Sequence, residues 1–341
     1  MIEERLEPEA PARARLALAG ASGSKSSAVG RLAPSPTGAQ HLGNARTYLI
    51  AWLHARSRGG QVVLRMEDID SPRVKPGAAH QALEDLRWLG LDWDGEPVVQ
   101  TQRLAAYQKA LNALKADELV YPCTCSRADV ERAASAPHLE HESSAYPGVC
   151  AGRRVADAAS LQDRQFAWRF RVPGQAIVFL DVFRGPQAVN PATNGGDFVV
   201  WKSAGTPAYQ LAVVVDDAAQ GVTEVIRGDD LIPSTPRQLL LYHALGLTPP
   251  QFGHVPLVVV PDGRRLAKRH GDTRLGALRE AGVRPEMVIG LLAWSCGWID
   301  RLEPVAVRDL LPTPRLETIP RAAWVLTPAH LRAIGDDVER I

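Results

Sequence analysis

The segment from residue 28 to residue 53 constrains the fold of this chain more than any other. The apolar stretch Val29-Gly30-Arg31-Leu32 leads into the turn Ala33-Pro34-Ser35-Pro36-Thr37-Gly38-Ala39-Gln40, and the residues from His41 onward continue into an apolar run that is typical of a helix. A strand, a turn rich in proline and glycine, and a helix start with an imidazole form a natural seat for a nucleotide phosphate. The helix start should offer free backbone N–H groups and a positive dipole. The segment therefore predicts a nucleotide-binding α/β unit.

Further strands and helices predict a parallel sheet. The apolar run at 61–66 suits a buried strand, and helical spacing follows at 77–89 and 104–114. This order implies right-handed crossovers between parallel strands. After an interruption the α/β pattern returns, in segments at 198–201, 209–215, 222–227, 234–245 (a helix) and 256–260 (a strand).

The interruption has a different character. It contains three cysteines and two alternating apolar runs, 166–172 and 176–183, which we expect to be inserted antiparallel strands. The chain divides into five predicted parts, which are a disordered extension at 1–27, the first half of the nucleotide-binding fold at 28–114, an inserted zinc-containing subdomain at 115–195, the second half at 196–275 and a mainly helical stem-contact domain at 276–341.

Composition and patterning point away from a membrane protein. With 341 residues, of which 45% are hydrophobic and 23% charged, the chain resembles an ordinary globular protein of two or three domains. No apolar run approaches the length of a membrane span, and the acidic residues near the N-terminus argue against a signal peptide. Because the formal net charge is +1, any RNA-binding surface must be local. Clustered cysteines indicate a reducing compartment.

A basic segment in the second half, Gly263-Arg264-Arg265-Leu266-Ala267-Lys268-Arg269-His270-Gly271, follows the strand expected at 256–260. A mobile loop that delivers a lysine can neutralise the charge on a departing pyrophosphate. An isolated basic cluster is more often a solvated turn. The strand immediately upstream, and the separation of this loop from His41 by two sheet halves, favour the catalytic interpretation.

An acidic run, Glu67-Asp68-Ile69-Asp70, follows the buried strand at 61–66. The carboxyl end of a strand in an open α/β sheet faces the ligand crevice, where a carboxylate can pair with a substrate ammonium group. Taken alone, such a run is more often a solvated turn, and occasionally a magnesium site.

The inserted segment offers three thiolates, those of Cys123, Cys125 and Cys150. Structural zinc takes four N, S or O ligands in a tetrahedron, and His138 and His141 of the same segment are chemically suited to complete the set. Three unrelated buried thiols are the alternative. Cys296 is expected to pack in a helix without a role in the cluster.

These motifs resemble those of class I aminoacyl-tRNA synthetases, over about residues 28 to 300. His41-Leu42-Gly43-Asn44 resembles the HIGH signature of that class, and the string Arg31 to Gly38 and the acidic run resemble its glutamate-specific branch. The basic loop resembles the KMSKS loop, with Arg265 in the first position and Ala267 where serine is common. The Cys-x-Cys and Tyr-x3-Cys patterns, in a chain that stops about forty residues after Trp298, make it similar to the glutamyl-Q tRNA(Asp) synthetase family, which lacks the large anticodon-binding region.

The resemblance implies roles for individual residues. It assigns glutamate binding to Arg31, Ser35, Glu67, Tyr209 and Arg227. It assigns catalysis to His41 and Lys268, and ATP binding to these two residues together with Gly43 and Asn44. The motif loops also contain Pro34, Gly38, Leu42, Arg265, Leu266, Ala267 and Arg269. It implies that Tyr146, ahead of His138 or His141, completes the zinc site with Cys123, Cys125 and Cys150. Asp68 and Asp70 are expected to be structural.

Two arginines suit a dicarboxylic substrate, because a planar guanidinium binds a carboxylate bidentately. Arg31 and Arg227 therefore fit glutamate. Val213 stands where glutamyl enzymes usually carry asparagine, which implies a somewhat different pocket.

The implied fold is α/β, a Rossmann-type parallel sheet with an inserted α+β connective subdomain that carries the zinc loop, and a small helical C-terminal stem domain. The implied activity is ATP-dependent activation of L-glutamate and its transfer to queuosine at the wobble position, in the anticodon stem-loop of tRNA(Asp). One structural Zn²⁺ per chain and Mg²⁺ with ATP are the implied cofactors, and the enzyme would be a cytoplasmic monomer without membrane contact. The alternatives are a truncated glutamyl-tRNA synthetase that charges a tRNA 3′ end, and a non-catalytic paralogue.

Overall fold

The structure is a computed structural model. It describes residues 28–69, 74–126, 128–130, 146–161, 165–264, 266, 273–312 and 315–335. The extension predicted at 1–27 lies outside these residues.

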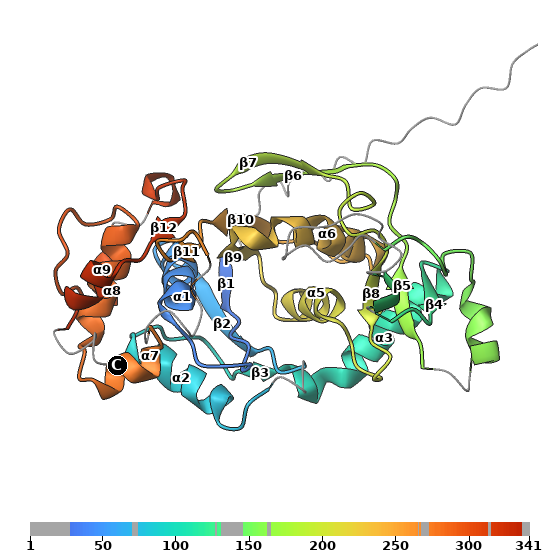
Figure 1. Cartoon of the computed structure of the whole chain (residues 1–341), viewed down its shortest axis with the longest axis horizontal. Helices are drawn as coiled ribbons and strands as arrows, with labels where there is room; N and C mark the ends of the chain where they lie inside the picture. The colour runs from blue at the N-terminus through green and yellow to red at the C-terminus, as the bar shows by residue number, and fades with distance from the viewer. Residues whose placement is uncertain are drawn as a thin grey trace, which may run out of the picture.

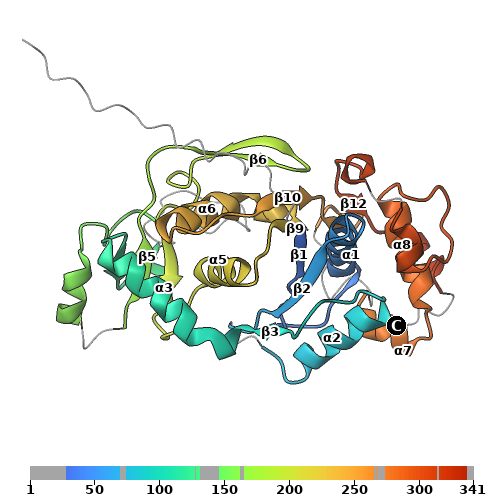
Figure 2. The same ribbon diagram turned by 180° about the vertical axis from the view of Figure 1, so that it is seen from behind.

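Two half-sheets form the centre of the molecule (Figure 1, Figure 2). The first has the order β1-β2-β3, with β1 at Val29–Leu32, β2 at Gln61–Met66 and β3 at Val98–Val99. The second has the order β7-β6-β10-β9, with β6 at Ile177–Asp181, β7 at Gly185–Val189, β9 at Glu224–Gly228 and β10 at Gln251–Val255. β1 and β9 are neighbours, and beside them the Thr223 N–H donates to the Val29 carbonyl at 3.0 Å. All pairings except β6 with β7 are parallel, which confirms the predicted α/β class.

Helices connect and cover these strands. They are α1 (Leu42–Arg56), α2 (Ala78–Trp88), α3 (Leu104–Ala116), α5 (Tyr209–Ala219) and α6 (Thr235–Ala244). α1 packs against β1 and β9 and also against α8 (Pro285–Ser295), so that Leu49, Trp52 and Leu53 are almost completely buried. Burial on several sides explains the weak amphipathicity of this helix. Within the described parts of the chain, no helix combines the length and apolar character needed to cross a membrane.

Strand pairing in the inserted part differs from the prediction. A separate antiparallel sheet has the order β4-β5-β8 and consists of β4 (Val120–Cys123), β5 (Ala167–Phe170) and β8 (Phe198–Trp201). The prediction that 198–201 rejoins the α/β pattern is therefore wrong. The run at 176–183 contains β6, which forms an antiparallel hairpin with β7. β6 also pairs in parallel with β10 and so extends the central sheet. Short strands of similar composition can join either sheet, because the sheet to which a strand belongs is decided by its pairing with strands far away in the sequence.

Two elements of the second half were not predicted as such. β10 precedes the strand expected at 256–260, of which only β11 (Val258–Val259) pairs, with β12 (Trp324–Val325). The apolar segment at 209–215 is the first part of helix α5, which packs against α3, α6 and β8.

The prediction that 276–341 is mainly helical is wrong for the described residues beyond α8. α7 (Leu275–Glu280) and α8 are followed by single-turn 3₁₀ segments, by β12 and by the short α9 (Pro328–Arg332). Prolines at 304, 312 and 320 interrupt this segment, since a proline lacks the N–H that a helix interior needs. This part lies at one end of the molecule and the β4-β5-β8 sheet at the other (Figure 1).

Arg46, the last residue of the first motif, is buried and joins α1 to the C-terminal part. Its Nε donates to Ser295 Oγ at 2.9 Å, and its Nη1 donates to the Pro256 carbonyl at 2.9 Å. These bonds fix the position of α1 relative to α8 and to the segment after β10.

Candidate functional site

His41 caps α1 with its own imidazole. Its Nδ1 accepts from the backbone N–H groups of Gly43 at 3.1 Å and Asn44 at 3.4 Å, and Asn44 Oδ1 accepts from the His41 N–H at 3.3 Å. Because the Leu42 N–H donates to the Thr273 carbonyl, the expectation of free backbone donors at this helix start is wrong. An accepting Nδ1 requires the Nε2–H tautomer of a neutral ring, so Nε2 carries a donor suited to a phosphate oxygen.

Gly43 is needed for this cap. A Cβ at position 43 would lie 3.0 Å from both Cε1 and Nδ1 of His41, so a side chain would displace the ring. The glycine therefore has a structural reason in addition to its predicted contact with ATP. Gly38 lies in the preceding turn and is half-buried.

The basic loop is anchored beside His41. After the loop, the Leu275 N–H donates to the Gln40 carbonyl at 2.9 Å, and Arg274 forms an antiparallel bridge with His41. Within the loop, Leu266 is buried in the same apolar core as α1. The residues that directly follow the basic loop therefore lie at the start of α1. The other residues predicted here, Arg265, Ala267, Lys268 and Arg269, lie outside the described residues.

The turn after β1 is bonded to the end of β2. The Glu67 N–H donates to the Pro34 carbonyl at 3.0 Å, and the Ser35 hydroxyl donates to the Glu67 carbonyl at 3.2 Å. Tyr48 of α1 donates to Gln40 Oε1 in the same turn at 2.8 Å. Two neighbouring strand ends are joined in this way at the carboxyl edge of the sheet, where α/β folds bind ligands.

A buried charge network holds Arg31. Its Nε lies 3.5 Å from Asp217 Oδ1 of α5, and its Nη1 donates to the Ile226 carbonyl of β9 at 3.3 Å. Arg65 of β2 donates to the same Asp217 oxygen at 2.7 Å and to Glu67 Oε1 at 3.0 Å. Buried charges persist only when they are paired. The network therefore fixes Arg31 and Glu67 relative to each other, although they come from different strands.

Arg227 is near enough to Arg31 for the two charges to interact, and each arginine is less than a tenth exposed. Its side-chain donors are almost fully used by the protein, at His254 Nε2 (3.0 Å), Gln238 Oε1 (2.8 Å), Thr235 Oγ1 (2.8 Å) and the Leu231 carbonyl (3.4 Å). A guanidinium has five N–H groups, so these four partners leave a single Nη1 hydrogen, and the Tyr209 hydroxyl is a further hydrogen-bond partner of this guanidinium. The bidentate contact expected of Arg227 does not fit this arrangement, and Arg31 is the better bidentate donor.

Helix α5 adds two of the predicted positions. Tyr209 is 38% exposed and interacts electrostatically with Arg227, Glu67 and Arg31. Val213, one turn later, is 1% exposed and packs in the apolar core. The asparagine-to-valine difference therefore falls on a core position in this chain.

Asp68 has the structural role expected of it. Its carboxylate accepts from the Thr101 N–H at 2.9 Å and from the Thr101 hydroxyl at 2.6 Å, which joins the end of β2 to the 3₁₀ turn Gln100–Arg103. Asp70 lies outside the described residues.

Three cysteines cluster at the end of β4. The Sγ atoms of Cys123, Cys125 and Cys150 lie within 4.8 Å of one another. The Tyr146 hydroxyl oxygen is 3.5 Å from Cys123 Sγ and accepts from the Cys150 N–H at 2.8 Å. Three thiolates and one oxygen donor fit tetrahedral zinc, so this cluster can hold a metal ion. Tyr146 as fourth ligand stays a prediction, because the competing residues, His138 and His141, lie outside the described residues.

The thiols of the cluster have different surroundings, and burial together with bonds to the neighbouring cysteines raises the pKa of Cys125 to about 11. Arg169 Nε donates to Cys123 Sγ at 3.2 Å, and its guanidinium lies 3.9 Å from the centre of the Tyr146 ring. Burial acts to raise the pKa of Cys150, but a backbone hydrogen bond from Thr124 and bonds from neighbouring side chains lower it to about 7. The thiolate is the form that binds zinc.

The purified protein is expected to contain about one zinc ion per chain, held by the cysteine cluster. Cys123→Ser should lose this zinc and lower the melting temperature, because the metal joins segments far apart in sequence. Elemental analysis and thermal denaturation measure both effects. Cys296→Ser is the matched control, since Cys296 is also buried but lies at the end of α8, outside the cluster. A metal-free wild-type protein of full stability would show that the thiols are merely packed.

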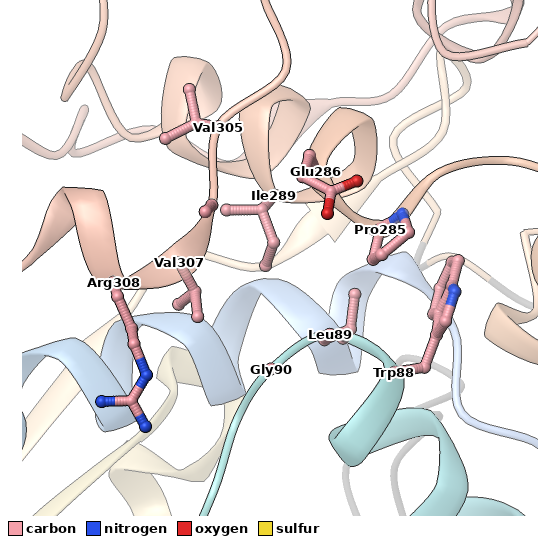
Figure 3. A pocket seen from close by; sticks show the side chains of 10 residues that line it. Trp88, Leu89, Gly90, Pro285, Glu286, Ile289, Val305, Val307 and Arg308 are labelled. Carbon is pink, nitrogen blue, oxygen red and sulfur yellow. The ribbon is translucent and has the colours of Figure 1, made fainter.

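A separate hollow of about 200 Å³ lies where the end of α2 meets the start of α8 and residues 305–308 (Figure 3). Its lining is mostly apolar and includes the charged residues Glu286 and Arg308. None of the predicted site residues lines it, so it is distinct from the candidate site.

Sequence reasoning missed the residues that hold the two site arginines, which are Arg65, Asp217, Thr235, Gln238 and His254. A signal existed for two of them, because Arg65 lies inside an apolar strand and Asp217 is the second of two aspartates that follow an apolar run. A charge within a buried element needs a partner. Thr235 and Gln238 carry no comparable signal.

Comparisons with known proteins show the family of this chain. Residues 28–303 match the family described as tRNA synthetases class I (E and Q), catalytic domain. The chain is 52% identical to a protein of Rhodopirellula baltica named glutamyl-Q tRNA(Asp) synthetase, over 88% of this chain and 94% of that one, and 52% identical to a protein of the same name from Symbiobacterium thermophilum, over 86% and 94%. The crystal structure of the glutamate-tRNA synthetase from Elizabethkingia anophelis matches with a TM-score of 0.76 and 28% identity, over 89% of this chain and 69% of that one.

Proposed function

The chain belongs to the class I tRNA synthetases of the E and Q group and is a ligase-type enzyme, and from this we propose that it activates L-glutamate with ATP and transfers the glutamyl group to queuosine at the wobble position of tRNA(Asp). The observation that carries the proposal is the convergence of Arg31, Glu67 and Arg227 at one edge of the central sheet, where the turn that leads to His41 is bonded to the end of β2. The names of the two relatives at 52% identity support the queuosine target.

The charges at this edge suit glutamate. Oε1 of Glu67 forms an ion pair with Arg65, and the substrate ammonium group would pair with the same carboxylate. Among the described residues, Arg31 Nη2 makes no hydrogen bond, so this guanidinium has donors for a substrate carboxylate. Arg227 adds positive charge beside it, and the Tyr209 hydroxyl adds a neutral hydrogen bond. A dicarboxylate substrate needs both cations.

Activation is an in-line displacement at phosphorus. An oxygen of the glutamate α-carboxylate forms a bond to the α-phosphorus of ATP, the bond from that phosphorus to the bridging oxygen breaks, and pyrophosphate leaves. His41 Nε2–H would donate to a phosphate oxygen, and Lys268 would neutralise the charge that develops on pyrophosphate. Mg²⁺ would be held mainly by the ATP phosphates. The protein mainly positions the reactants and stabilises charge.

Transfer breaks the mixed anhydride. A hydroxyl oxygen of the queuosine cyclopentenediol attacks the glutamyl carbonyl, an ester forms as the hydroxyl proton is released to solvent, and AMP leaves with the electron pair of the broken bond. The substrate for this step is the anticodon stem-loop, whereas a tRNA-charging enzyme acts on the 3′ end.

A transfer assay with labelled glutamate tests this target. The protein and ATP are incubated with three RNAs, namely an isolated tRNA(Asp) anticodon stem-loop with queuosine, the same stem-loop with guanosine, and a full tRNA that lacks queuosine but has an intact CCA end. Label on the first RNA alone is the expected result. Label that requires the CCA end would instead identify a tRNA-charging enzyme.

ATP–pyrophosphate exchange with glutamate and no tRNA tests the activation step separately. Exchange that depends on glutamate is expected. Its absence, in protein that is folded and contains metal, would favour a non-catalytic paralogue.

A further inference from the structure

Arg227 is held by a chain of three buried side chains on adjacent strands. Asp181 ends β6, His254 lies on β10 and Arg227 lies on β9, in the sheet order β6-β10-β9. Asp181 Oδ2 is 2.5 Å from His254 Nδ1, and Arg227 Nε donates to His254 Nε2 at 3.0 Å. All three side chains are at most 3% exposed. The proposed reaction does not use Asp181 or His254 directly.

The direction of the hydrogen bonds follows from Arg227. A guanidinium has donors only, so His254 Nε2 must accept, and Nδ1 must carry the proton and donate to Asp181. The other Asp181 oxygen accepts from the backbone N–H groups of Phe183 at 2.9 Å and Arg184 at 2.7 Å. Burial acts to raise the pKa of Asp181, but the bonds from His254 and the backbone lower it overall. The carboxylate therefore stays ionised and selects the Nδ1–H tautomer.

A neutral imidazole is the state that suits this position. Burial lowers the pKa of His254 and the charge of Arg227 adds to this, although the bond to Asp181 opposes it. A protonated ring would direct an Nε2–H at the Nε–H of Arg227 and would place two positive groups in contact. The tautomer set by Asp181 is therefore the one that orients Arg227.

The bond to Nε fixes the plane of the guanidinium. Gln238 and Thr235 hold the two terminal nitrogens, and the guanidinium carbon lies 5.0 Å from the centre of the Phe252 ring below it. His254 is the partner at Nε, and Thr235 Oγ1 also lies 3.2 Å from His254 Nε2. Loss of the imidazole would remove the acceptor shared by Arg227 and Thr235, and would let the guanidinium turn about its Nε bond.

We propose that His254, held in its Nδ1–H tautomer by Asp181, is a positioning residue for Arg227 and thereby sets the affinity and selectivity for an acidic amino acid. The proposal rests on the proposed function, because Arg227 is assigned there to the glutamate pocket. His254 acts through Arg227 and contacts no substrate.

Kinetics of ATP–pyrophosphate exchange compare two variants of His254. His254→Leu removes the acceptor and should raise the KM for glutamate by about tenfold or more, the loss typical of a hydrogen bond to a charged group, with the KM for ATP and kcat nearly unchanged. His254→Gln keeps an acceptor oxygen and should recover most of the glutamate affinity. The preference for glutamate over glutamine should fall in His254→Leu in parallel. His243→Leu, an exposed histidine on α6, is the matched control.

Asp181→Asn tests whether Asp181 acts on Arg227 through His254, because asparagine has nearly the same shape as aspartate. An asparagine amide directed at Nδ1 would favour the Nε2–H tautomer of His254. The Nε2–H would then face the Nε–H of Arg227, and two donors cannot form a hydrogen bond. The KM for glutamate should therefore rise as in His254→Leu. The double variant Asp181→Asn with His254→Gln should lose little more than His254→Gln alone, because the effect of Asp181 passes through the imidazole.

Nitrogen NMR of histidine-labelled protein gives a readout that needs no activity. The wild-type His254 resonance, assigned by its absence in His254→Gln, should show a protonated Nδ1 and an unprotonated Nε2. The opposite tautomer, or an unchanged KM for glutamate in an active, folded His254→Leu, would overturn the proposal. Equal losses for ATP and glutamate would do the same, because they would indicate general damage. A wild-type protein without glutamate-dependent exchange would refute the proposed function, and the tautomer would still be decided by the spectrum.

Discussion

Arg31→Leu is expected to lower kcat/KM for glutamate by roughly 100- to 1,000-fold in ATP–pyrophosphate exchange, with the KM for ATP nearly unchanged. Arg31 is the guanidinium with donors left for a substrate, since its Nη1 bonds to the Ile226 carbonyl and its Nε makes only a 3.5 Å ion pair with Asp217. Removal of one partner from a buried charge pair costs more than removal of an exposed one. Steady-state kinetics at varied glutamate and fixed ATP measure the effect.

The fold should tolerate this change. Asp217 keeps its 2.7 Å hydrogen bond from Arg65, so no unpaired buried carboxylate is created. Arg56→Leu is the control, because Arg56 also forms ion pairs with carboxylates, those of Asp92 and Asp94, but is the last residue of α1, at the end opposite His41. It should leave the exchange rate within about twofold of wild type, as expected for a partly exposed ion pair away from the site. If Arg31→Leu behaves like Arg56→Leu, Arg31 does not bind the substrate.

Lys268→Ala is expected to slow adenylate formation by about 100-fold or more, which is the effect of losing one transition-state donor. The affinity for glutamate should change little, because the role proposed for the lysine is to neutralise charge on the departing pyrophosphate. The structure anchors its loop beside His41 through Arg274 and Leu275, which supports this role. Single-turnover measurement of pyrophosphate release separates the chemical step from substrate binding.

Arg264→Ala is the control within the same loop. Arg264 is exposed and bonds to the Asp262 carboxylate, so its loss removes one positive charge without removing the proposed catalytic group. Its turnover should stay close to wild type. A Lys268→Ala enzyme with unchanged turnover would remove the catalytic role proposed for the loop.

Local sequence patterns predicted which elements and which residues form the candidate site, but they did not predict the hydrogen bonds that these residues make. The strand, turn and helix from residue 28 to residue 56, the parallel sheet and the cysteine cluster were all predicted, because each depends on spacing within a short segment or on the order of neighbouring elements. The free backbone donors at the start of α1 were predicted wrongly, since His41 bends back onto them. No local rule distinguishes a histidine that caps its own helix from one that leaves the N–H groups open.

The pairing partners of the strands could not be predicted from the sequence either. β6 and β8 have similar apolar patterns, yet one extends the central sheet and the other joins the separate antiparallel sheet. The helices predicted after α8 are largely absent from the described residues there, because the prolines of this region interrupt helices.

The sequence by itself determined which chemical groups stand at the ends of the central strands, because periodicity and turn residues are encoded over a few positions. Only the tertiary structure decided which of those groups remain available to a substrate. Arg65 and Asp217 are 152 residues apart and Arg227 and His254 are 27 residues apart, so their pairing depends on the whole fold. The physical reason is that a buried guanidinium satisfies its donors with whatever acceptors packing brings near, and that competition leaves Arg31 with donors for a ligand while Arg227 is held in place.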